Sequence, residues 1–317
     1  MKIYLDSMVI SLMRNKTKYT DIEKYLIYNH GRHSFYYSNA HIQDLKNDKT
    51  DNKYLDLEYI GKYLGNNYLC KIINKPTMLY NCPPISAFED EIKGEEDGFA
   101  SMGDIFNNPF IKNCESLLNF PLDISGIINF DSLNIPNEFK TYLENIIENT
   151  KHFSLENLYN NQMAYQEQLQ NNPKLFKWTR RIVKENANLF VNGKFNKDNI
   201  IHDKIFLKDN SEMTFLEYII TNTNIHTNNK DDIFQLFFIN GFTILNILGL
   251  DNEKNEKVQF TNTINDGLHS YYASYCDILV SNDAKMKEKA NIMYELFSIK
   301  TEIVDPADFI DFISNDN

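Results

Sequence analysis

Apolar and β-branched runs near the start of the chain predict two strands, each followed by a helix. Residues 2–5, Lys-Ile-Tyr-Leu, form a β-like run that stops at Asp6, and the apolar residues after it predict a buried helix. The run 34–38, Ser-Phe-Tyr-Tyr-Ser, is also β-prone. A helix over about 40–46 follows it, with Asn39 as the expected N-cap. The N-terminal region therefore begins as strand, helix, strand, helix.

The C-terminal segment repeats this alternation. Its pattern predicts, in chain order, a helix at 264–275, a strand at 277–280, a helix at 284–297, a strand at 301–304 and a short helix at 306–313. Alternating strands and helices are typical of a parallel sheet that is covered on both faces. Because the first strand of the chain has the same character, we expect the two chain ends to form one α/β domain.

The middle of the chain has mainly helical periodicity. The candidate helices lie at 53–64, 138–149, 154–170, 174–190, 213–222 and 231–248. Prolines and an acidic run favour irregular structure or a long loop at 75–135. We therefore expect a discontinuous α/β domain formed by 1–65 and 262–317, with a mainly helical insertion at 66–261.

Composition excludes several classes of protein. Hydrophobic residues make up 42% of the 317 residues and aromatic residues 13%, too many for a disordered chain. The four cysteines have no CxxC spacing, so neither a structural zinc site nor a disulfide framework is indicated. The first apolar run contains an aspartate and has no cleavage motif, and no stretch reaches the ~20 apolar residues of a membrane span. We expect a cytoplasmic protein.

Acidic residues occupy positions next to the predicted strands. Asp6 ends the first strand, and Asp283 lies three residues beyond the strand that ends at Val280. Asp44 lies within the helix after the second strand, and Asp266 near the start of the helix before the Val280 strand. Ligands of parallel α/β sheets bind beyond the carboxyl ends of the strands. Carboxylates gathered there would suit Mg²⁺ or Mn²⁺, which prefer hard oxygen ligands.

Three segments resemble the successive acidic motifs of PIN-domain nucleases: LDSMVIS, SNAHIQDL and NDGLHSYYASYCDILVSND. The resemblance covers about 1–65 and 262–312. It implies a compact α/β/α sandwich with a central parallel sheet, and an acidic quartet that binds Mg²⁺ or Mn²⁺ for nuclease chemistry. The quartet positions correspond to Asp6, Asp44, Asp266 and Asp283. Two features depart from the family: the second acid is more usually Glu, and the insertion is much larger.

Each acid also has a structural interpretation. Asp6 and Asp283 could cap the helices that follow them, Asp266 could be a cap or first-turn acid, and Asp44 a solvated helix residue. Neighbouring polar residues are candidates for orienting the carboxylates or a metal-bound water, or for packing without a catalytic role. They are Ser7, His41, His269, Asp277 and Ser281.

The chain is acidic, with a formal net charge of -12, which argues against nonspecific coating of nucleic acid. A carboxylate site that binds metal ions is compatible with this charge. The best basic patch is the predicted helix that carries Lys174, Lys177, Trp178, Arg181 and Lys184. It could follow a phosphate backbone beside a stacking ring, or be a solvated cationic face with Trp178 in the core.

The resemblance and the acids together predict a metal-dependent endonuclease that hydrolyses phosphodiester bonds, with RNA as the expected substrate. Two alternatives remain open: a PIN-like binding or scaffold protein without catalysis, and a structure-specific DNA nuclease. No phosphate-binding GxxxxGK[ST] loop and no GxSxG motif is present, so neither nucleotide-driven nor serine-hydrolase chemistry is indicated. A regulatory protein partner and a role in toxin or antiviral systems are expectations from the family alone.

Overall fold

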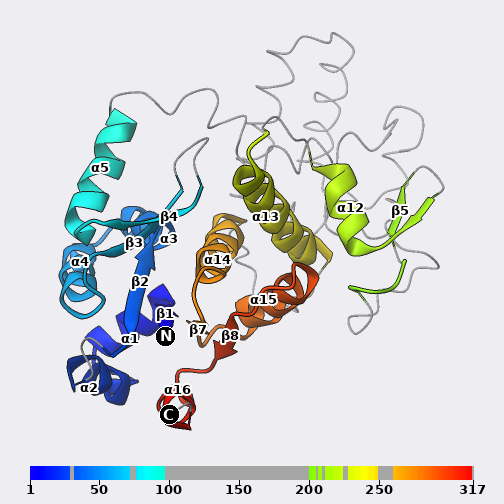
Figure 1. The fold of residues 1–317 in the computed structure, drawn as a ribbon. Coiled ribbons are helices and arrows are strands. Elements are labelled where there is room, and N and C mark those ends of the chain that lie inside the picture. The colour runs from blue at the N-terminus through cyan, green and yellow to red at the C-terminus, as the bar shows by residue number, and fades with distance from the viewer. Residues whose placement is uncertain are drawn as a thin grey trace, which may run out of the picture. The chain divides into compact units, whose positions relative to one another are not determined.

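The computed structural model describes the chain in several ranges: 1–28, 32–71, 76–96, 200–204, 206–208, 211–223, 228–248 and 260–315 (Figure 1). The chain divides into two compact units. The first contains Met1–Ile105, Ile225–Asn246 and Asn262–Asn317, and the second contains Phe106–Asn224 and Ile247–Thr261. The first unit is larger than the expected 1–65 and 262–317, because it also contains β3 (Asn67–Cys70), β4 (Met78–Asn81), α5 (Pro84–Glu96) and most of α13 (Lys230–Leu248).

A mostly parallel sheet forms the centre of the first unit. The strands of this sheet in the described residues are β1 (Lys2–Leu5), β2 (Ser34–Ser38), β3 (Asn67–Cys70), β4 (Met78–Asn81), β7 (Ile278–Val280) and β8 (Glu302–Val304). Their order is β4-β3-β2-β1-β7-β8, and only the β3–β4 pair among them is antiparallel. Ile3 pairs with Phe35 on one side and with Ile278 on the other. The predicted joining of the two chain ends in one parallel sheet is confirmed.

Helices cover one face of this sheet through an aliphatic and aromatic core. They are α1 (Ser7–Arg14), α2 (Thr20–Tyr28), α4 (Asn52–Tyr63), α5 (Pro84–Glu96) and α16 (Phe309–Asn315). Ile3 and Leu5 of β1 belong to this core together with Val9, Leu57 and Phe309 of the helices. Apolar residues at alternate strand positions therefore anchor the helices on this side.

The opposite face of the sheet contributes several of the candidate site residues. Tyr4, between Ile3 and Leu5, is fully buried there and reaches α3 (Asn39–Asn47) and α14 (Phe260–Ala273). Both α13 (Lys230–Leu248) and α15 (Ala284–Leu296) pack near α14 (Figure 1). Gly267 allows α13 to come close, because a Cβ atom there would lie 3.3 Å from Ile239 Cδ1 and 3.4 Å from the Phe242 ring.

The region expected to be irregular contains regular structure. β3 and β4 form an antiparallel pair, and α5 begins at Pro84, a position that suits proline because the first helical residue needs no N–H partner. Two helix starts also differ from expectation. Ser38 rather than Asn39 caps α3, through a hydrogen bond from Ala40 N–H, and α14 begins at Phe260.

The described part of the second unit contains β5 (Phe206–Lys208), β6 (Ser211–Met213) and α12 (Phe215–Asn222). Thr214 and Glu217 form a capping box at the start of α12, and Phe206 stacks on Phe215. The predicted helices at 213–222 and 231–248 are thus confirmed, whereas 138–149, 154–170 and 174–190 lie outside the described residues. In the ranges described, no helix is long and apolar enough to cross a bilayer.

Candidate functional site

The candidate site lies at the carboxyl ends of β1 and β7, where the order of the strands reverses. From β1 the chain continues outward to β2, β3 and β4, and it later returns on the other side of β1 as β7. Asp6 directly follows β1, and its N–H donates to the carbonyl of Val280 at the end of β7, at 3.0 Å. Ligands of open α/β sheets bind at such switch points.

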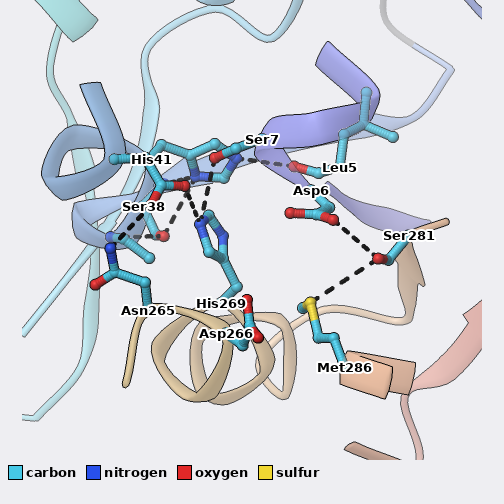
Figure 2. Close-up of polar contacts among 12 residues, drawn as sticks. Leu5, Asp6, Ser7, Ser38, His41, Asn265, Asp266, His269, Ser281 and Met286 are labelled. Atoms are coloured by element: carbon cyan, nitrogen blue, oxygen red, sulfur yellow. Dashed lines mark hydrogen bonds and ion pairs between the residues drawn. The ribbon is translucent and has the colours of Figure 1, made fainter. Parts of the chain in front are cut away.

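Asp6 is held by a serine rather than by the helix it precedes. It occupies the N-cap position of α1, but its side chain makes no capping hydrogen bond, so the capping interpretation is wrong. Its carboxylate is buried, and Oδ2 accepts a hydrogen bond from Ser281 Oγ at 2.9 Å (Figure 2). Ser281 Oγ also accepts from the N–H of Asp283 at 3.1 Å. One hydroxyl group thus links two of the predicted acids.

Asp283 has a structural role and is available for another. Its Oδ1 accepts hydrogen bonds from the N–H groups of Lys285 and Met286 at 2.8 and 2.9 Å, which caps α15. Both capping bonds use the same oxygen, and among the described residues Oδ2 accepts no hydrogen bond. The capping interpretation and the ligand interpretation of Asp283 are therefore compatible.

Asp44 is paired with a histidine. His269 of α14 donates from Nε2 to Asp44 Oδ2 at 2.8 Å, and Asn265 donates to Oδ1 at 3.0 Å. Burial acts to raise the pKa of Asp44, but the charge and hydrogen bond of His269 outweigh it and lower that pKa. Burial conversely acts to lower the pKa of His269, and Asp44 raises it. Asp44 is thus half of an ion pair and not a solvated helix residue.

A buried hydrogen-bond network contacts His269 on the side of its ring away from Asp44. The hydroxyl group of Tyr4 lies 2.7 Å from His269 Nδ1 and 2.6 Å from Ser38 Oγ. His41 donates from Nε2 to the carbonyl of Leu5 at 2.8 Å, and burial followed by the nearby His269 lowers its pKa to about 3. His41 is therefore a neutral structural residue near neutral pH.

Asp266 is a carboxyl group of the site whose pKa is strongly raised. Because α14 begins at Phe260, Asp266 lies inside the helix and neither caps it nor occupies its first turn. Burial raises its pKa to about 7; Lys289 acts to lower it, while Asp283 and Asp6 raise it further. Among the described residues its carboxylate accepts no hydrogen bond, and Figure 2 shows it on the side of α14 nearest Asp6.

The raised pKa values show that these carboxylates act on one another. Burial raises the pKa of Asp6, and the carboxylates of Asp44 and Asp283 add to the shift, whereas His269 and Ser281 oppose it. Burial is the main cause of such shifts, and crowding of like charges adds to them. A hard divalent cation would relieve them, so the oxygen donors of Asp6, Asp266 and Asp283 fit Mg²⁺ or Mn²⁺ in kind. Across the described ranges, no group of three or more His, Cys, Asp or Glu side chains is arranged closely enough to hold a metal ion.

The remaining predicted residues have different outcomes. Ser7 Oγ lies 3.2 Å from His269 Nε2 and so belongs to the site. Asp277 precedes β7, and its Oδ2 accepts a hydrogen bond from Lys2 N–H at 2.7 Å. Asp277 therefore lies at the amino ends of the strands, away from the other acids at the carboxyl ends, and cannot orient their carboxylates. The basic residues Lys174, Lys177, Trp178, Arg181 and Lys184 lie outside the described residues.

One buried charged residue near the predicted acids was not singled out from the sequence. Lys289 of α15 is 1% exposed and lies near the acids. The sequence did contain a signal for this residue. Lys289 is three or four residues from Met286, Ala290 and Met293 and so shares the apolar face of the helix with them. A lysine in such a position needs an opposite charge in the core.

Comparison of the chain with protein-family models, with curated proteins and with solved structures finds no match.

Proposed function

We propose that this protein is a metal-dependent nuclease of the PIN type that hydrolyses phosphodiester bonds, with RNA as the favoured substrate. The observation that carries this function is the group of carboxylates at the strand switch point, Asp6, Asp266 and Asp283, in which burial raises the pKa of Asp6 and of Asp266. The three acidic motifs support it, because these aspartates occupy the positions that the resemblance assigns to metal ligands.

Asp6, Asp266 and Asp283 would hold the ion, and Asp44 would complete the quartet. When bound, the ion would polarise the scissile phosphodiester and lower the pKa of a water molecule for attack. Ser281 orients the Asp6 carboxylate, and the cap of α15 orients that of Asp283. Asp266 must lose its proton before it can bind a cation, so a pKa near 7 makes metal loading dependent on pH in the neutral range.

One observation favours a second candidate, a PIN-like protein without catalysis that binds RNA or protein. Both oxygens of Asp44 already accept hydrogen bonds, from Asn265 and His269. An acid held in this way contributes to a metal site only if one of these bonds is broken. In this second function the same residues would fix the fold of the two chain ends, without hydrolysis.

Cleavage assays with Mn²⁺ separate the two functions. Single-stranded RNA and branched DNA are incubated with wild-type protein, with Asp6→Asn and with Asp277→Asn, each with Mn²⁺ or with EDTA. Asp277→Asn is a matched control, since it removes the same charge at the amino ends of the strands, away from the candidate site. We expect Mn²⁺-dependent RNA cleavage by wild type and by Asp277→Asn, and none by Asp6→Asn.

Faster cleavage of branched DNA than of RNA would assign the protein to the structure-specific DNA nucleases instead. Binding of RNA by wild type without cleavage at any Mn²⁺ concentration would favour the noncatalytic function. Equal cleavage by wild type and Asp6→Asn would contradict the carboxylate centre.

A further inference from the structure

The carboxylate of Asp44 is held on both of its oxygens by one face of α14. His269 donates from Nε2 to Oδ2 at 2.8 Å, and Asn265 donates from Nδ2 to Oδ1 at 3.0 Å. The two donors are one helical turn apart in α14, so their side chains lie on the same face of the helix. Together they fix both the position and the plane of the carboxylate.

The donor that binds Oδ2 is itself held by buried groups. Tyr4 is fully buried, and its hydroxyl group lies 2.7 Å from His269 Nδ1 and 2.6 Å from Ser38 Oγ. The side chain of His269 is 3% exposed, whereas that of Asp44 is 31% exposed. Asp44 thus presents part of its carboxylate to solvent, while buried groups hold the rest in place (Figure 2).

This arrangement suits a water molecule better than a metal ion. A carboxylate oxygen can accept two hydrogen bonds, so each oxygen of Asp44 can accept one from water and still keep its donor. An ion bound at Oδ2 would lie about 2.1 Å from that oxygen, and therefore within about 5 Å of His269 Nε2. The N–H group there points its positive end at Oδ2 and would repel a divalent cation at that distance.

The other three acids of the site differ from Asp44 in this respect. Among the described residues, the carboxylate of Asp266 accepts no hydrogen bond, and Asp6 and Asp283 each accept through a single oxygen. Ser281 also links Asp6 to Asp283 through one hydroxyl group. Each of these three acids therefore has an oxygen that can bind an ion, whereas Asp44 would have to give up a donor or bind the ion against its repulsion.

We propose that Asp44 does not bind the metal ion directly but accepts a hydrogen bond from a water molecule next to it and so orients that water. In this role His269 and Asn265 are positioning residues, because they act only through the carboxylate that they hold. The inference rests on the proposed function, since it concerns the same site. It leaves Asp6, Asp266 and Asp283 as the protein ligands of the ion.

The first test measures Mn²⁺ affinity of the full-length protein by electron paramagnetic resonance titration. Wild type is compared with Asp44→Asn and with Asp283→Asn, which makes the same substitution at a proposed ligand. Asn also caps helices, so Asp283→Asn keeps the start of α15. If Asp44→Asn does not give a cooperative thermal transition, the smaller Asp44→Ser replaces it.

We expect Asp44→Asn to bind Mn²⁺ with an affinity within about tenfold of wild type, because a group that acts on a metal through another group has a limited effect on binding. Asp283→Asn should weaken binding by more than about a hundredfold, because a ligand itself is lost.

The second test separates positioning from mere support of the fold. His269→Leu removes the donor to Oδ2, whereas His269→Gln keeps a donor near the position of Nε2. With an RNA substrate and saturating Mn²⁺, His269→Leu should lower kcat by about tenfold to a hundredfold and leave KM and Mn²⁺ affinity near wild type, because a misplaced water attacks more slowly. His269→Gln should recover most of the lost kcat.

A loss of Mn²⁺ affinity in Asp44→Asn greater than about tenfold would show that Asp44 is a ligand. An unchanged kcat in a folded His269→Leu protein would refute the positioning role. Either result overturns this inference and leaves the proposed nuclease intact. A wild type that binds no Mn²⁺ would instead refute the metal centre itself, and this inference with it, so the wild-type titration tells the two failures apart.

Discussion

Replacement of Asp266 by Asn should stabilise the metal-free protein, although Asp266 lies at the centre of the candidate site. The pKa of this carboxyl group is raised from 3.8 to about 7, first by burial and then by Asp283 and Asp6, against the opposing charge of Lys289. Above the folded pKa the carboxylate is ionised in a place that disfavours its charge. Asn has nearly the same shape and carries no charge.

The size of the effect follows from proton linkage. At pH values between the pKa of Asp266 in the unfolded chain and its higher pKa in the folded protein, the folded protein binds more protons than the unfolded chain. The contribution of Asp266 to the free energy of unfolding therefore falls as pH rises. A shift of about 3 units corresponds to about 4 kcal/mol once both states are ionised. Local relaxation and water entry reduce this to between about 2 and 4 kcal/mol at about pH 8. The difference should shrink by at least about 1 kcal/mol at about pH 5, where the folded group is protonated.

Urea denaturation of wild type and Asp266→Asn in EDTA measures this difference at both pH values. The free energy of unfolding of Asp266→Asn should exceed that of wild type at the higher pH, and the gap should narrow at the lower pH. Mn²⁺ should stabilise wild type by mass action and stabilise the variant less. A variant that is less stable than wild type at the higher pH, or a gap independent of pH, would refute the burial of a charged Asp266.

Two further substitutions test the network behind the site. Asp44→Asn should lower the free energy of unfolding by about 1 to 3 kcal/mol, because it removes the ionic partner of buried His269. Urea denaturation near neutral pH measures this change, and an unchanged free energy of unfolding would mean that the pair is not formed. Tyr4→Phe should cost about 1 to 3 kcal/mol, because Ser38 and His269 lose a buried hydroxyl partner. If thermal melting shows Tyr4→Phe to be as stable as wild type, that network does not join the chain ends.

Periodicity and residue type alone determined much of the α/β unit. The first two strands and the last two were predictable because each is a short run of apolar or β-branched residues, and parallel strands are buried on both faces. The positions of Asp6 and Asp283 next to strand ends followed from the same runs. The edge strand β4 was not predictable, because Met78 and Leu79 are about half exposed and no buried face imposes an alternation.

What only the tertiary structure decided is how the acids are paired. Asp44 and His269 are 225 residues apart in the chain, and nothing in the spacing of either motif indicates that they form an ion pair. The same holds for Lys289, whose proximity to Asp266 depends on the packing of α13, α14 and α15. The strength of a charge interaction depends on distance and burial, which are properties of the folded chain. The sequence could therefore supply the carboxylates of the site, whereas their ionisation and their partners arose from the fold.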